Sequence, residues 1–193
     1  MAHAPSGTVA FLFTDIEGST SLLQRLGTSY VSLLETHYRL LREAITRYHG
    51  YEFNTQGDSM FAAFADAGDA LAAAVEAQCA LSHQVWPGEA IMRVRMALHA
   101  GEPTLAGGDY FGLDVHHAAR LVAAASGGQV LLSQRTRDLI SEAIPPDVAL
   151  LDLGRHRLKD LPSSETIYQL VIRGLPNEFP PLSSLESRLH NLP

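Results

Sequence analysis

The feature that most constrains this chain is a short apolar run that ends in an acidic residue. The run from Val9 to Phe13 is apolar and rich in residues that favour β-structure, so we expect a buried strand there. Asp15 follows where the apolar run stops, and Gly18-Ser19-Thr20 then supplies a turn and the start of a helix. A carboxylate at the end of a buried strand is a natural ligand for a hard metal ion.

A second carboxylate, Asp58, is expected in a turn between two strand-like runs. Tyr51–Asn54 and Met60–Phe64 are joined through Thr55-Gln56-Gly57, which is typical of a β-hairpin. If this hairpin is a neighbour of the first strand, Asp15 and Asp58 can bind one metal cluster. The plainer interpretation is that Asp15 balances a helix dipole and Asp58 is an ordinary turn residue.

Length and charge limit the classes of protein that the chain can belong to. Its 193 residues, 46% of them hydrophobic, can bury roughly 70% of the unfolded surface, enough for one domain of ordinary size. The formal net charge of −7 argues against a nucleic-acid partner or an anionic membrane surface. No apolar run approaches the ~18 residues of a membrane span, and no signal-peptide pattern is present, so we expect a cytoplasmic protein. The single Cys79 excludes an intrachain disulfide framework.

Helical and strand-like periodicities alternate along the chain. Apolar residues recur at helical spacing from Leu22 to Tyr48, as one long helix or as a short one plus a long one. Further expected elements are a helix at 67–85, a strand at 93–99, a glycine-bearing loop at 101–108, a helix at 113–125, a strand at 129–133, a helix at 134–144 and a closing hairpin of 149–158 with 165–172. This order predicts an α+β sandwich of the ferredoxin-like type, with a mostly antiparallel sheet and helices packed on one face.

The end of the chain has a different composition. Residues 173–193 show little periodicity and include Pro176, Pro180, Pro181 and Pro193. We therefore place one domain at 7–172 and a Pro-rich linker or tail at 173–193, which would connect to a C-terminal domain beyond this chain.

Four motifs follow one another in an order and spacing that we do not expect by chance. They are Phe13-Thr-Asp15-Ile-Glu-Gly-Ser-Thr20, Asn54-x-x-Gly57-Asp58-x-x-Phe61, Asp109-x-x-Gly112-x-x-Val115-His116-x-Ala118-x-Arg120 and Leu153-Gly154-x-His156-x-Leu158-Lys159. Together they resemble the catalytic domain of the class III nucleotidyl cyclases, over about residues 7–172. Taken singly, Asn54 and Asp109 read as turn residues and Arg120 as a solvated helix residue.

The resemblance implies a metal site shared between two chains. Two Mg²⁺ or Mn²⁺ ions per site would be bound by Asp15, Ile16 and Asp58. The ions would activate the ribose 3′-hydroxyl and neutralise the departing pyrophosphate. The sites would lie at the interface of a head-to-tail homodimer, with the metal ligands from one chain and the remaining groups from its partner.

The resemblance also implies the contacts to a purine nucleotide, ATP or GTP. Asn54 and Asp109 would contact the purine, and Lys159 would contact the triphosphate. His116 and Arg120 would act on the ribose and on transition-state charge. The products would be the 3′,5′-cyclic monophosphate and pyrophosphate.

Two positions depart from the usual pattern of that family. Asn54 stands where an adenine-selecting lysine is usual, and His116 stands where an asparagine is usual. Because the uncharged amide of Asn54 can donate or accept, we expect looser base selectivity, with ATP favoured. Because the imidazole of His116 can still donate a hydrogen bond to the ribose, we expect a low rate of turnover rather than none. A rival interpretation is a degenerate domain that binds nucleotide or partners and regulates a C-terminal signalling or transcription-related module.

The adjacent histidines cannot act together through helical spacing. On a helix the side chains of His116 and His117 diverge by about 100°, so at most one of them faces a pocket.

Overall fold

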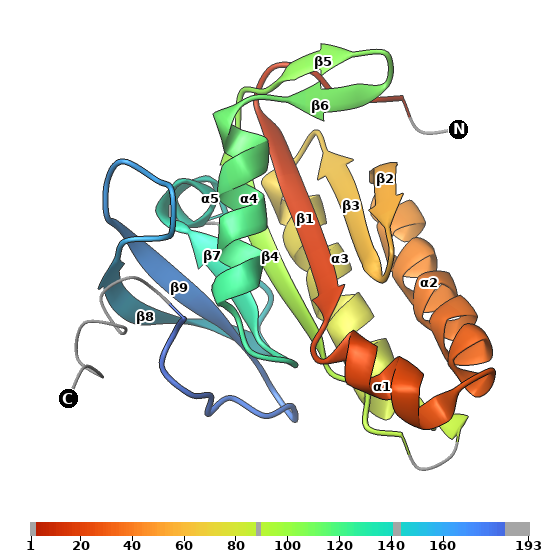
Figure 1. Ribbon diagram of the computed structural model, residues 1–193. Helices are drawn as coiled ribbons and strands as arrows, with labels where there is room; N and C mark the ends of the chain where they lie inside the picture. Colours follow the sequence, from red (N-terminus) through yellow and green to blue (C-terminus); the bar gives the residue numbers. More distant parts are fainter. Residues whose placement is uncertain (1–2, 88–89, 141–143, 184–193) are drawn as a thin grey trace.

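The computed structural model of the chain describes residues 3–87, 90–140 and 144–183 (Figure 1). Its elements are, in chain order, β1 (Val9–Ile16), α1 (Ser19–Leu26), α2 (Ser29–Arg47), β2 (Tyr51–Gln56), β3 (Ser59–Phe64), α3 (Ala67–His83), β4 (Val94–Gly101), β5 (Thr104–Ala106), β6 (Asp109–Phe111), α4 (Leu113–Ala124), β7 (Val130–Ser133), α5 (Gln134–Leu139), β8 (Val148–His156) and β9 (Glu165–Ile172). Within these described ranges, no helix is both long and apolar enough to cross a membrane.

The main sheet has seven strands in the order β2-β3-β1-β4-β7-β9-β8. Every neighbouring pair is antiparallel except β4 and β7, which run parallel. The short strands β5 and β6 form a separate hairpin at one end of the molecule (Figure 1). The predicted α+β class with a mostly antiparallel sheet is therefore confirmed.

Helices cover both faces of this sheet, so the prediction that they pack on one face is wrong. The side chains of β1 alternate, and Leu12 and Ile16 pack into the core that α2 and α3 cover. Phe11 and Phe13 pack on the opposite face, with Leu121 of α4. Figure 1 shows α4 in front of β1 and α3 behind it. The physical reason is that a strand apolar at consecutive positions must bury both of its faces.

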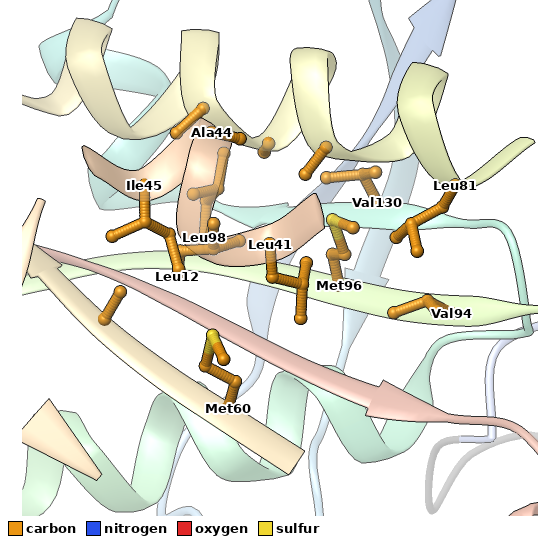
Figure 2. Packing of buried hydrophobic residues seen from close by; sticks show 14 of the residues in the cluster. Leu12, Leu41, Ala44, Ile45, Met60, Leu81, Val94, Met96, Leu98 and Val130 are labelled. Carbon is orange, nitrogen blue, oxygen red and sulfur yellow. The ribbon is translucent and has the colours of Figure 1, made fainter. Parts of the chain in front are cut away.

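The larger core lies between the sheet and the α2–α3 pair. Figure 2 shows Leu12, Met60 and Leu98 of the sheet facing Leu41 and Ala44 of α2. All five are no more than 1% exposed, and each buried leucine contributes roughly 2 kcal/mol through removal of apolar surface from water. This packing fixes β1 against its neighbours, which is what positions the residues at its end.

Several predicted boundaries shift in the structure. The two helices between 22 and 48 are a short one and a long one, separated at Gly27, whose φ of 54° lies in the left-handed region. The helix expected at 67–85 ends at His83, and the one expected at 134–144 ends at Leu139, with 141–143 outside the described residues. The first strand continues past Phe13 to Ile16 because it pairs with β4 along its whole length.

The described part of the predicted tail contacts the domain. Leu182 is 4% exposed, and the backbone N–H of Ser183 donates to the carbonyl of Ala124 at 3.3 Å. Gln169 Nε2 donates to the carbonyl of Asn177 at 2.7 Å. The division at residue 172 stays a prediction, and residues 184–193 lie outside the described ranges.

Candidate active site

The two aspartates singled out from the sequence lie side by side. β1 pairs with β3, so the turn that carries Asp58 is a neighbour of the end of β1, which is the condition on which the proposed metal pair depends. The backbone N–H of Ile16 donates to Asp58 Oδ2 at 2.9 Å. In the other direction, Ser59 Oγ donates to Asp15 Oδ1 at 2.7 Å. Each carboxylate is thus fixed by the residue that follows the other one.

Arg95 is a residue of this region that the sequence analysis did not single out. It pairs directly with Asp15 across β1 and β4, so both side chains lie on the same face of the sheet. Arg95 Nε and Nη2 lie 2.7 and 2.5 Å from Asp15 Oδ2. The two side chains are 28% and 21% exposed, so this ion pair is partly shielded from water. The alternation of apolar and polar residues at 93–99 predicted a strand. It could not predict the partner of Arg95, because Asp15 lies on a strand far away in the sequence.

Helix α2 supports the turn that carries Asp58. His37 Nε2 donates to the carbonyl of Asp58 at 3.3 Å, and the hydroxyl of Tyr38 donates to the carbonyl of Gly57. His37 is fully buried, and this burial lowers its pKa to about 4. The imidazole is therefore neutral at pH 7, and its Nδ1 has no partner in the part of the chain that the structure describes.

The donor set at this place fits a hard divalent ion. Asp58 Oδ1 accepts no hydrogen bond from the described residues, so it remains available to a ligand. The side chain of Ile16 carries no oxygen, nitrogen or sulfur atom, so only its backbone carbonyl can serve as a ligand, and the residue as a whole is 1% exposed. Residues 3–87, 90–140 and 144–183 contain no group of three or more His, Cys, Asp or Glu side chains able to hold a metal. Two carboxylates with further oxygens from a phosphate ligand match Mg²⁺ or Mn²⁺, whereas a closed zinc site needs four protein ligands.

The predicted groups on α4 and after β8 form a second region. Arg120 Nη2 lies 2.7 Å from Asp160 Oδ2, which ties α4 to the turn that also carries Lys159. Arg120 and Asp160 are 40% and 58% exposed, and such a pair is worth only about 0–1 kcal/mol. Lys159 and His116 are exposed. Arg120 can therefore exchange Asp160 for a new partner with little loss of folding free energy.

The two predicted purine contacts lie on different sheets, Asn54 on the main sheet and Asp109 on the β5–β6 hairpin. Asn54 is exposed on β2, at a register shift between Glu52 and Asn54. Asp109 begins β6, and its Oδ1 accepts from the backbone N–H of Tyr110 at 2.8 Å. The hydroxyl of Tyr51 donates to the carbonyl of Gly108 at 3.1 Å and joins β2 to the β5–β6 hairpin.

Polar contacts do not link the aspartates to the Arg120 region within the described part of one chain. Among the described residues, no hydrogen bond or ion pair joins Asp15 or Asp58 to Arg120 or Lys159. The structure therefore brings the aspartates together and places Arg120 close to Lys159, but does not unite the two sets.

The chain matches the family described as the adenylate and guanylate cyclase catalytic domain over residues 1–171. It belongs to this family. The cyclase domain is 38% identical, over 185 residues, to an uncharacterised protein of Mycobacterium tuberculosis, a match that covers 95% of this chain and 62% of that protein. It is 29% identical to an adenylate cyclase of Podospora anserina, over 89% of this chain and 11% of that protein. The chain thus spans less than two thirds of these relatives.

Solved structures share the fold of the cyclase domain. A Trypanosoma brucei adenylate cyclase in its monomeric state has a TM-score of 0.84 at 27% identity, with 94% of this chain and 96% of that chain covered. An adenylate/guanylate cyclase/hydrolase of Silicibacter pomeroyi has a TM-score of 0.77 at 27% identity, covering 91% and 100%. The family expected from the four motifs is confirmed.

Proposed function

We propose that this cyclase domain converts ATP to the 3′,5′-cyclic monophosphate and pyrophosphate. GTP would be a second substrate, because we expect the site to discriminate between the two purines only weakly. The observation that carries the proposal is the pair of carboxylates Asp15 and Asp58, each fixed by the neighbour of the other. A structural role alone does not require two partly exposed carboxylates at the end of a buried strand.

The aspartates form the metal-binding half of the proposed site. Bound Mg²⁺ or Mn²⁺, two per site, would activate the 3′-hydroxyl and neutralise charge on the leaving pyrophosphate. Ser59 and Arg95 orient Asp15, and Ile16 N–H orients Asp58, so both carboxylates are pre-organised before any ligand arrives.

Arg120, Lys159 and His116 form the other half of the proposed site. Arg120 and Lys159 supply positive charge for the triphosphate and the transition state, and His116 lies near them as a donor to the ribose. Asn54 and Asp109 present uncharged and charged polar groups to the purine edge. Because no hydrogen bond or ion pair joins the two halves within the described part of one chain, we propose a head-to-tail homodimer that brings the aspartates of one copy to Arg120 of the other.

A second candidate function is regulatory. Asp15 already has an ion-pair partner in Arg95, and the match to the mycobacterial relative covers only 62% of that protein. A domain that binds nucleotide without turnover, and signals to a C-terminal module, would use the same surface. The cytoplasm is the proposed location in either case.

The two candidates are separated by one assay. Purified chain is incubated with MnATP or MnGTP, and cyclic product is resolved from simple hydrolysis. We expect cyclic AMP above background, loss of product when EDTA removes the metal, and recovery on adding Mn²⁺. Nucleotide binding without cyclic product in any condition would contradict the cyclase proposal and favour the regulatory one.

A further inference from the structure

A chain of polar groups, fully buried at His99 and partly buried at His117, Asp114 and Glu165, lies between α4 and the sheet. His117 of α4 stacks on His99 of β4, with ring centroids 3.9 Å apart and planes 17° apart. His117 Nε2 hydrogen-bonds Glu165 of β9, and His99 Nε2 lies 3.2 Å from Asp114 Oδ1 at the start of α4. Two histidine–carboxylate pairs therefore join the helix to the sheet.

The proton positions in this chain follow from its partners. Thr136 Oγ1 donates to the carbonyl of Leu98 at 3.1 Å, so its hydrogen is not available to Ser133. His99 Nδ1 lies 2.9 Å from Ser133 Oγ, and an ionised Asp114 can only accept. A neutral His99 must then donate from Nε2 to Asp114 and accept from the Ser133 hydroxyl at Nδ1.

The charges around the pair favour this neutral form of His99. Burial, followed by the adjacent His117, lowers the pKa of His99 to about 4, against raising effects from Asp114 and Glu165. The remaining charged groups are those around Asp114, namely Arg135 of α5 and Glu102, whose backbone N–H donates to Asp114 Oδ2 at 2.9 Å. His99 is thus uncharged near neutral pH.

The fold leaves room for Asp114 only because residue 101 is glycine. A methyl group at Gly101 would lie 2.1 Å from Cγ of Asp114. The carboxylate therefore packs directly on the backbone of β4 and fixes the first turn of α4. The second half of the helix is positioned differently, by the buried apolar side chains of Ala118, Leu121 and Val122.

We propose that His99 and His117, with Asp114 and Glu165, are positioning residues that set the place of α4 over the sheet, and with it His116 and Arg120. His117 is next to His116 and one helical turn before Arg120, so loss of the Glu165 contact shifts both. The effect on turnover rests on the proposed cyclase function, whereas the effect on the helix and on His99 does not.

Variants at His117 and Glu165 distinguish the contribution of the His117 ring from that of its hydrogen bond to Glu165. His117→Phe keeps a flat ring against His99 and loses the donor to Glu165, whereas His117→Gln keeps a donor and loses the ring. Glu165→Gln removes the acceptor charge, in case His117→Phe does not fold. His83→Gln is the matched control, because His83 is an exposed histidine on α3 that bonds only the carbonyl of Cys79.

Turnover is measured with MnATP. In His117→Phe we expect kcat to fall about tenfold with KM within about threefold, because misplaced groups act mainly in the transition state. His117→Gln should recover part of that loss, and His83→Gln should match the parent. A folded His117→Phe with parental kcat, or an equal loss in His83→Gln, would overturn the proposal.

Two further readouts do not depend on activity. The ring resonances of His99 are followed by NMR against pH, and exchange of the α4 amides with solvent is compared between variants. In His117→Phe, His99 should titrate at higher pH than in the parent, and amides at 113–120 should exchange at least about threefold faster. If the parent makes no cyclic product, the cyclase proposal fails, and these two readouts alone decide the positioning proposal. Unchanged titration and exchange would overturn it.

Discussion

The aspartate region and the Arg120 region of the candidate site are built in opposite ways. Asp15 and Asp58 receive hydrogen bonds or ion pairs from β1, β3 and β4, and α2 supports the turn from behind. Arg120 has one exposed ion pair with Asp160 and can leave it at small cost. The fold of a single chain therefore pre-organises one half of the site. In the other half, Arg120 can change its contact when substrate or a second copy binds.

The largest expected effect comes from the pre-organised half. Asp58→Asn keeps an acceptor for Ile16 N–H but removes the charge, so cyclic product formation should fall about a thousandfold, or about 4 kcal/mol. The measurement is initial rate with MnATP, and Asp138→Asn on α5 is the control. A rate within tenfold of the parent would show that this carboxylate is a turn residue only.

The second effect concerns the support of the Asp58 turn. His37 has its pKa lowered to about 4 by burial, so the unfolded chain binds more protons between about pH 6.5 and 4. The part of the free energy of unfolding that depends on neutral His37 is fully present above about pH 6.5 and is lost as the pH falls towards 4. We expect the drop in Tm between pH 7 and pH 5 to shrink by about 5 °C in His37→Gln, measured by circular dichroism. His83→Gln should keep the full drop, and an equal drop in all three proteins would contradict the assignment.

A smaller effect is expected at Asn54. Because its amide can donate or accept, kcat/KM for ATP and GTP should differ by less than about a hundredfold in the parent. Asn54→Lys should raise the preference for ATP about tenfold. Strict discrimination by the unmodified chain would show that selectivity comes from elsewhere in the site.

The smallest effect is expected at the exposed His116. An imidazole changes charge near neutral pH and an amide does not, so His116→Asn should flatten the rate profile below pH 7. The rate at pH 8 should rise about threefold relative to the parent, because an amide N–H donates at any pH. An unchanged profile and rate would mean that His116 is an ordinary helix residue and that Arg120 acts without it.

Local patterns in the sequence predicted β1 and the hairpin that carries Asp58, whereas the pairing of β1 with that hairpin was only a condition. They did so because a strand end and a hairpin turn are defined within a few residues. Arg95 and the partly buried pair His99–Asp114 could not be found in this way, since the partners lie on strands and helices far apart along the chain. The apolar run at Val9–Phe13 did contain one unused signal, because consecutive apolar positions indicate helices on both faces of the sheet.

The central claim is that the two regions meet between two copies of the chain. In a 1:1 mixture of Asp58→Asn and Arg120→Ala chains, random exchange gives heterodimers with one intact site and one doubly altered site. We predict recovery of about a quarter of the parental cyclase activity, while each variant alone is inactive. No recovery, with subunit exchange verified by differently labelled chains, would contradict a site shared between copies.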